Sequence, residues 1–235
     1  MNENKPIVRL ATPDDKHYAE QITTEMEESA KARGTGIAKR SPDYIRQKME
    51  EGKAVIATME DGAWVGFCYI EEWEHRKYVA NSGLIVAPEF RKTGVATEIK
   101  HKIFELSRKK YPNSKIFGLT TGLAVMKINS DLGYEPVTYS ELTRDETFWK
   151  GCQSCINYDI LMSKERKNCL CTAMLFDPEE VAEKEQQRAS SAGGNGVMTL
   201  EKTKKRQFRN NLGLFARWVR FKQYVLLKAS KKRKV

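Results

Sequence analysis

The sequence predicts an α/β fold of the α+β kind, and three observations support it. Leu84-Ile85-Val86 is a short, β-branched apolar run that is typical of a buried strand. Two apolar segments further upstream flank Glu60-Asp61-Gly62, a turn sequence typical of a β-hairpin. After Pro88, apolar residues recur at helical spacing, at Val95, Ile99, Ile103 and Leu106. Strands and helices therefore alternate along this part of the chain.

Capping and turn residues predict the remaining elements. Pro13 and Pro42 each follow a hydroxyl-bearing residue, as prolines in the first turn of a helix often do. Gly34 and Gly133 are expected to end helices. We expect helices from Pro13 to Gly34 and over 42–51 and 122–132. We expect strands at 7–10, 54–58, 64–70, 116–120 and 134–137, with the last strands inside 156–161 and 168–176.

The positive charge is concentrated at one end of the chain. The 235 residues carry a net charge of +10, but residues 200–235 hold 13 Lys and Arg against one Glu, a charge of +12. Residues 1–199 are therefore near neutral, and charge-driven contact with nucleic acid or a membrane surface concerns the tail. The sequence has no apolar run of about 18 residues and begins with a polar segment. We expect a cytoplasmic protein whose five cysteines stay reduced unless they bind metal or do redox work.

Composition divides the chain into a main domain and an extension. Residues 5–178 form the predicted domain, in which the segment 141–172 carries four cysteines. Residues 179–199 turn polar and then rich in Ser and Gly, as linkers do. Residues 200–235 place apolar residues on one helical face, with Lys and Arg mostly opposite. Such a tail packs on its own domain or on the partner in a homodimer, or it touches RNA or a membrane surface.

The turn between the strand at Leu84 and the helix at Val95 is suited to bind an anion. Backbone N–H groups at the start of a helix have no partner within the helix. Gly94 lets the main chain approach a ligand closely, and Arg91 and Lys92 add positive charge. The alternative is an ordinary capped turn with no ligand.

This turn and its surroundings resemble the GNAT superfamily of acyl-coenzyme A N-acyltransferases. Arg91, Gly94 and Ala96 match the R/Q-x-x-G-x-G/A pyrophosphate loop of that family, and the order of elements is similar over residues 7–140. The junction Asp131-Leu132-Gly133-Tyr134 resembles the family's "klGF" junction. The resemblance implies a mixed central sheet with helices on both faces and an acyl-CoA donor.

The resemblance also implies which residues hold the donor. Backbone groups near Ile85 and Val86 are expected to contact the pantetheine and the thioester, and the Val86 N–H is the expected oxyanion donor. In the family a tyrosine that protonates the leaving thiolate sits four residues before the junction glycine, where this chain has Asn129. The expected cofactor-binding residues are Ile85, Val86, Arg91, Lys92, Thr93, Gly94, Val95, Ala96 and Asn129.

Catalytic acids and bases are less clearly marked. Because an asparagine cannot donate a proton for acid catalysis, Tyr134 or another tyrosine takes that role, or the thiolate leaves without a dedicated acid. The strand from Tyr78 to Val86 has no carboxylate, so Glu72, Glu74 or His75 just upstream is the candidate base. The alternative for these residues is a solvated strand end.

Four cysteines form a second group. Cys152 and Cys155 have the spacing of a metal-chelating turn, and Cys169 and Cys171 point to the same side of a strand. A four-sulfur structural zinc site is therefore one prediction. Reduced core thiols or a redox pair are the others. Cys68 lies in a predicted strand, where it is expected to be a core residue.

Further segments, among them GTGIAKR, ANSGLIV and the cysteine-bearing end, resemble a group of bacterial GNAT proteins from the Bacteroidetes that is linked to arginine biosynthesis. The implied reaction is transfer of an acetyl or succinyl group from acetyl- or succinyl-CoA to the α-amino group of glutamate. Arg33, Lys39 and Arg40 are the candidates to bind an anionic acceptor. The alternatives are a protein or polyamine N-acetyltransferase, or a non-catalytic module that binds CoA or associates with RNA.

Overall fold

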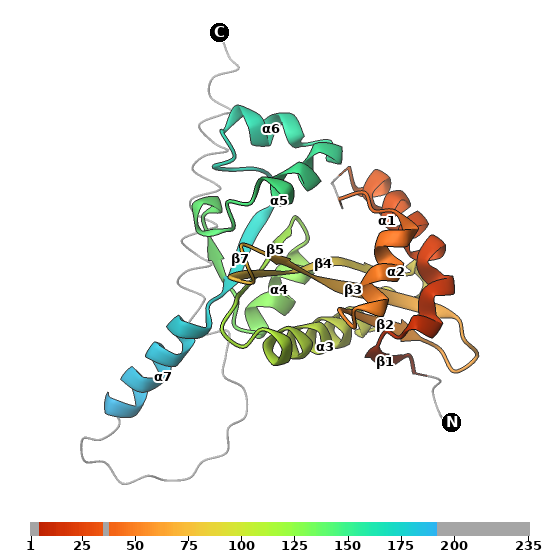
Figure 1. Cartoon of the computed structure of the whole chain (residues 1–235), viewed down its shortest axis with the longest axis horizontal. Coiled ribbons are helices and arrows are strands. Elements are labelled where there is room, and N and C mark those ends of the chain that lie inside the picture. Colours follow the sequence, from red (N-terminus) through yellow and green to blue (C-terminus); the bar gives the residue numbers. More distant parts are fainter. Residues whose placement is uncertain (1–4, 35–37, 192–235) are drawn as a thin grey trace. The chain divides into compact units, whose positions relative to one another are not determined.

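The computed structural model describes residues 5–34 and 38–191, which form a seven-stranded mixed sheet with helices on both faces (Figure 1). The strand order is β1-β2-β3-β4-β5-β7-β6. The strands are β1 (Ile7–Leu10), β2 (Ala54–Thr58), β3 (Trp64–Trp73), β4 (Tyr78–Val86), β5 (Lys115–Thr120), β6 (Glu135–Val137) and β7 (Thr172–Phe176). The predicted fold class is confirmed.

The sheet opens in the middle because β4 and β5 pair over only a short stretch. They are its one parallel pair, and every other neighbouring pair is antiparallel. Residues Tyr78–Ala80 pair with Lys115–Phe117, and beyond that point no pairing between the two strands is seen. The backbone groups past Ala80 and past Phe117 are therefore free to face a ligand.

Gly83 shapes β4 at the opening. Its φ is +64°, in the left-handed region that glycine enters without strain. A Cβ at this position would lie 2.3 Å from Cε1 of the Tyr69 ring. The pairing between β3 and β4 also shifts register between Phe67 and Tyr69, which is the signature of a β-bulge. β4 therefore bends where it parts from β5.

One face of the sheet is covered by α3 (Val95–Lys110) and α4 (Leu123–Asp131) (Figure 1). Strand alternation sends Cys68, Ile70 and Val79 to this face, where they join one core cluster with the apolar residues of α3. The turn at residues 91–96, which is expected to bind the donor, leads into α3 and so lies at the start of a helix on this face.

The opposite face is covered by two separate groups of elements. The first is the 3-10 helix η1 (Pro13–Tyr18) with α1 (Ala19–Arg33) and α2 (Pro42–Glu50), which pack over Ile56 and Phe67. The second is the segment 139–163, which packs Trp149 and Leu161 over Phe117. It contains η3 (Tyr139–Glu141), α5 (Glu146–Lys150), η4 (Gly151–Ser154) and α6 (Tyr158–Ser163).

One sequence prediction about the C-terminal part is wrong. Residues 156–161 were expected to form a strand, but Tyr158–Ser163 is helix α6, in which only Leu161 is buried. The predicted linker at 179–199 begins with a helix: Pro178–Ser191 forms α7, and its Lys184 makes an ion pair with Glu135 at 2.8 Å. The rest of the predicted linker and the basic tail at 200–235 lie outside the described residues.

No helix within the described ranges is long and apolar enough to cross a membrane.

Gly66 tests how tightly α3 packs on the sheet. A Cβ on Gly66 would lie 2.7 Å from Cδ1 of Ile99 and 2.9 Å from the carbonyl oxygen of Ile85, so Gly66→Ala must displace backbone. We expect it to lower the free energy of unfolding by about 1–3 kcal/mol in denaturant titrations. Gly118→Ala is the matched control in β5, because its Cβ meets nothing closer than 3.7 Å. Equal stability of the two variants would contradict the packing described.

Candidate functional site

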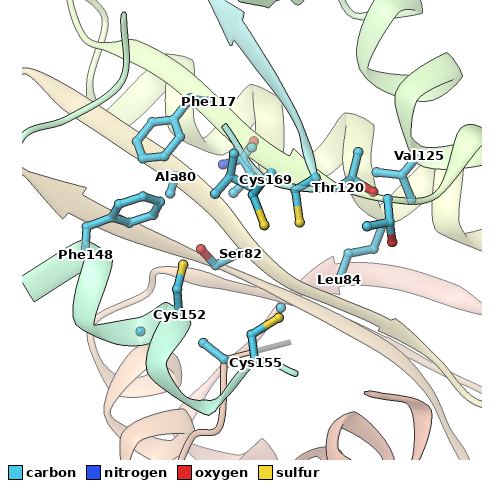
Figure 2. A pocket seen from close by; sticks show the side chains of 18 of the residues that line it. Ala80, Ser82, Leu84, Phe117, Thr120, Val125, Phe148, Cys152, Cys155 and Cys169 are labelled. Carbon is cyan, nitrogen blue, oxygen red and sulfur yellow. The ribbon is translucent and has the colours of Figure 1, made fainter. Parts of the chain in front are cut away.

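A cavity of about 260 Å³ lies where β4 and β5 part. Its walls include residues 80–84 of β4 and residues 117–120 of β5 (Figure 2). Because successive residues of a strand point to opposite faces, these walls reach both faces of the sheet. Asn81 faces α3, where its amide donates to Ser107 Oγ at 2.7 Å. The cavity is therefore open to groups from α3 and α4 on one face and from α1 and the segment 139–163 on the other.

On the α3 and α4 side, two buried polar side chains line the cavity. Asn129 of α4 is 1% exposed, and its Oδ1 has no hydrogen-bond partner among the described residues. Lys100 of α3 is 2% exposed. A buried amide oxygen without a donor is costly, so it marks a place for a ligand N–H group.

The turn before α3 has the geometry of an anion site. Lys92 and Gly94 both have left-handed φ values, +68° and +96°, and Thr93 Oγ1 donates to the Phe90 carbonyl at 2.7 Å. Val95 and Ala96 begin the helix, and the first backbone bonds of α3 run from Thr97 and Glu98 to the Gly94 carbonyl. Residues 91–94 are exposed. The preceding N–H groups therefore remain available to oxygen atoms of a phosphate.

Arg91 is turned toward α1. Its guanidinium donates to the Val86 carbonyl at 3.1 Å, to Ser29 Oγ at 2.8 Å and to Glu25 Oε1 at 2.6 Å. The side chain thereby joins the turn to the end of β4 and to α1.

The backbone that lines the cavity lies slightly earlier in β4 than the sequence indicated. Ile85 and Val86 are paired with Phe67 and Gly66 of β3, and neither lines the cavity. Residues 82–84 line it instead, where the register shift leaves β4 bent. The sequence of one strand does not show how that strand pairs with its neighbour. The predicted cavity-lining residues therefore lie a few positions after those that line the cavity in the structure.

On the opposite face, the carboxylate that reaches the cavity is Glu71. It is 4% exposed, and its Oε1 accepts from Arg40 Nη2 at 2.9 Å and from the Tyr44 hydroxyl at 2.6 Å. Arg40 also donates to the Tyr69 hydroxyl at 3.1 Å. No described residue donates to Oε2 of Glu71. The carboxylate is thus fixed in position with one oxygen left for a ligand.

The sequence-predicted bases Glu72 and Glu74 lie away from the cavity. Glu72 points to the other face of β3 and pairs with Lys53 at 2.9 Å. Burial would raise the pKa of Glu72, but Lys53 and its other partners hold that pKa below its ordinary value. Glu74 lies in the turn after β3 at φ +49° and accepts from Thr143 Oγ1 at 2.8 Å. Both carboxylates therefore pair with other side chains outside the cavity, and neither lies where a base would act on a bound substrate.

Tyr134, the sequence-predicted acid, points at Asn81. Its hydroxyl donates to Asn81 Oδ1 at 2.9 Å, the residue is 2% exposed, and it does not line the cavity. Burial raises the pKa of the Tyr134 phenol well above its ordinary value. The hydroxyl is thus engaged in a buried hydrogen bond that leads through Asn81 to Ser107.

Of the three predicted acceptor-binding residues, two line the cavity. Arg33 lies at the end of α1, where Nε donates to the Ser29 carbonyl at 3.0 Å. Burial, followed by the neighbouring Arg91 charge, lowers the pKa of Arg33. Arg40 is held by Glu71 as described. Lys39 is exposed, pairs with Glu27 at 3.5 Å and lines a separate surface depression.

The predicted four-sulfur zinc site is not found. Among the described residues, no group of three or more His, Cys, Asp or Glu side chains could hold a metal ion. Cys152, Cys155, Cys169 and Cys171 instead line the cavity as free thiols (Figure 2). Cys155 Sγ accepts from the Asn157 N–H at 3.4 Å, and Cys169 Sγ donates to the Asn157 carbonyl at 3.8 Å. The backbone of Asn157 therefore forms hydrogen bonds with two of the four sulfurs, Cys155 Sγ and Cys169 Sγ, that were predicted to bind zinc.

Two of the four thiols have a raised pKa. Burial raises the pKa of Cys152 to about 11 and that of Cys171 to about 12. Because nucleophilic attack requires the thiolate, these two thiols are poor nucleophiles at neutral pH. Of the readings that the sequence left open, reduced thiols in a cavity wall fit this geometry.

Sequence reasoning missed three residues that line the cavity: Glu71, Lys100 and Asn157. Glu71 directly precedes the candidate base Glu72, and the alternation of side chains along β3 distinguishes the two residues once the buried face is known. Asn157 is 8% exposed, and its Nδ2 has no partner in the described part of the chain. Nothing in the sequence separates Lys100 from its exposed neighbours.

Comparison with known proteins shows what part of the chain is similar to a known family. The model of the acetyltransferase (GNAT) family matches residues 23–124, which include the turn at 91–96. No curated protein matches the chain.

Solved structures share the fold at low identity. The N-acetylglutamate synthase of Neisseria gonorrhoeae, with coenzyme A and N-acetyl-glutamate, is 16% identical with a TM-score of 0.53, over 75% of this chain and 36% of that one. A Mycobacterium tuberculosis protein bound to CoA is 16% identical with a TM-score of 0.52, covering 73% of this chain and 99% of that one. A Salmonella typhimurium structure with its cofactor acetyl-CoA is 14% identical with a TM-score of 0.51, covering 74% and 94%.

Over residues 23–124 the chain is therefore similar to the acetyltransferase (GNAT) family, and it shares its fold with solved acetyltransferase structures. The chain spans about a third of the length of the gonococcal enzyme.

Tyr134→Phe tests whether this phenol is structural. We expect the free energy of unfolding to fall by about 1–2 kcal/mol, because Asn81 Oδ1 loses its donor in a buried place. We expect kcat to fall far less than the roughly 100-fold that loss of a general acid causes. Tyr18→Phe is the control, since its hydroxyl bonds the Gly62 carbonyl at the surface. A large loss of kcat at unchanged stability would make Tyr134 an acid.

Proposed function

We propose that this enzyme transfers an acetyl or succinyl group from the corresponding CoA thioester to the α-amino group of glutamate. The observation that supports this is the cavity at the opening of the sheet, with Arg33, Arg40 and Glu71 on one face and Lys100 and Asn129 on the other. One face suits a small anionic amine, and the other suits the donor. The amine attacks the thioester carbonyl between them.

The donor enters from the α3 side. The backbone at Lys92, Thr93 and Gly94, continued by Val95 and Ala96, binds the pyrophosphate at the start of α3. The pantetheine then runs between α3 and α4, where the unpaired Asn129 Oδ1 accepts from one of its amide N–H groups. In this role Asn129 holds the donor and transfers no proton.

The acceptor lies between α1 and the cysteine-bearing segment. The Lys39 N–H donates to Ser154 Oγ at 3.3 Å, which brings the two elements together beside the cavity. Arg33 and the unpaired Asn157 Nδ2 are donors that can bind the two carboxylates of glutamate. A polyamine would bring positive charge beside Arg33 and Arg40, which disfavours that alternative.

Glu71 is the proposed proton acceptor. Glu71 lines the cavity, Arg40 and Tyr44 hold its Oε1, and no described residue donates to its Oε2. Direct contact or one bridging water would carry the proton from the acceptor ammonium. Loss of that proton produces the neutral amine that attacks the thioester.

The solved structures support the acceptor only by analogy. The gonococcal enzyme with the same fold is an N-acetylglutamate synthase, and its structure contains N-acetyl-glutamate. A role in arginine biosynthesis follows from glutamate as the acceptor and is part of the proposal.

The acceptor is tested by measuring free thiol release with acetyl- and succinyl-CoA against a panel of amino acids and polyamines. We expect turnover with glutamate. Arg33→Met is expected to raise the KM for glutamate about 10- to 100-fold, because a charged hydrogen bond to a carboxylate is lost. Lys39→Met is the control, since Lys39 lies outside this cavity. Turnover with polyamines alone would refute the proposed acceptor.

Glu71→Gln keeps the shape of the side chain but removes the base. We expect kcat to fall about 100-fold or more, with the CoA affinity unchanged, because CoA binds on the other face. Glu72→Gln is the matched control on the neighbouring position of β3 and should leave kcat near that of the unmodified enzyme. Equal effects of the two variants would remove Glu71 from the mechanism.

A further inference from the structure

Lys100 is a buried cation for which the described residues provide no counter-charge. It lies on α3, is 2% exposed and lines the cavity on the donor side. Within the described ranges, the side chain makes no ion pair and no hydrogen bond. Its Nζ lies 5.4 Å from the centroid of the Tyr134 ring. A buried ammonium held only by a ring face is costly, so its retention calls for a chemical reason.

The groups that face Lys100 from the described part of the chain are uncharged. Cys68 faces it from β3, and burial raises the pKa of that thiol to about 11, so the thiol is neutral. Tyr134 presents its ring while its hydroxyl bonds Asn81. Asn129 lines the same cavity from α4. Burial lowers the pKa of Lys100 below the ordinary lysine value.

The reaction itself produces an anion on this side of the sheet. When the tetrahedral intermediate collapses, the carbon–sulfur bond breaks and coenzyme A leaves as a thiolate. Of the polar side chains on the donor side, Asn129 cannot give up a proton and Tyr134 donates to Asn81. Among the described residues on this side, Lys100 is the remaining group that lines the cavity and carries an ionisable proton.

We propose that Lys100 is the catalytic residue that protonates the departing thiolate of coenzyme A. The electron pair of the broken carbon–sulfur bond passes to sulfur, and sulfur takes a proton from the Nζ ammonium. Lys100 is left as a neutral amine and regains its proton from solvent. The acceptor nitrogen loses two protons, one before it attacks and one as the amide forms, and both leave on the opposite face through Glu71 to solvent. Because solvent returns one proton to Lys100, the reaction releases one proton in total.

The other groups of the donor do not require a lysine at this position. A glutamine could form a hydrogen bond with a pantetheine amide without the cost of burying a charge. A carboxylate at the end of a succinyl chain would use the charge, but only with that donor. The thiolate is common to every acyl-CoA, and an amine with a lowered pKa is better matched to a thiol than an ordinary lysine is.

The first test needs no acceptor, so it is independent of whether glutamate is the substrate. Free coenzyme A is bound to the enzyme, and its thiol is titrated by thiolate absorbance, with desulfo-coenzyme A as the blank. We expect the pKa of the bound thiol to be about one unit or more lower in the unmodified enzyme than in Lys100→Met, because an ammonium favours the thiolate. Lys102→Met, an exposed position on the same helix, is the matched control. Equal pKa values in all three proteins would overturn the proposal.

The second test is kinetic. With both acetyl- and succinyl-CoA, Lys100→Met should lower kcat about 100-fold while KM for the donor changes little. In the unmodified enzyme kcat should fall as the pH rises through the pKa of Lys100, and this decline should be absent from the variant. A loss confined to succinyl-CoA, or a rise in KM with kcat unchanged, would overturn the proposal and make Lys100 a binding residue.

Discussion

The separation of β4 from β5 is the constraint on which the site depends. A parallel pair that ends after Ala80 and Phe117 leaves unpaired backbone inside the sheet, where it would be costly without a ligand. Gly83 maintains the bend, because its left-handed φ and the adjacent Tyr69 ring leave no room for a side chain. The register shift beside Tyr69 adds to the bend. The bend in one strand thus produces a passage that is open to both faces.

The two faces of this passage carry different electrostatic arrangements. On the α1 side, the charge of Arg40 is balanced by Glu71 at 2.9 Å, so the pair is stable before any substrate binds. On the α3 side, the described residues give Lys100 no such partner. A permanent ion pair positions groups for binding and for accepting a proton, whereas an unbalanced charge is useful only when a reaction creates the opposite charge. The sheet keeps the two arrangements apart.

Sequence predicted the elements better than the site. Ser41 does cap α2 by accepting from the Tyr44 N–H, and Gly34 ends α1 in the left-handed conformation, because both effects depend on a few neighbouring residues. The choice between Glu71 and Glu72 depends on which face of β3 is covered, which is a property of the whole fold. Lys100 was overlooked because lysines are usually exposed. The zinc prediction finds no support among the described residues, where no group of side chains could hold a metal ion.

Arg91 links the donor turn to the acceptor side through one buried residue. Ser29 of α1 is 5% exposed; its hydroxyl accepts from Arg91, and its carbonyl accepts from Arg33 one turn later. Two guanidinium groups therefore approach each other, and the charge of Arg91 contributes to the lowered pKa of Arg33. Glu25 pairs directly with Arg91, and its charge offsets only part of the lowering of the Arg33 pKa, so an anion bound by Arg33 would relieve the remaining repulsion. The position of the acceptor arginine is thus tied to the turn that binds the donor.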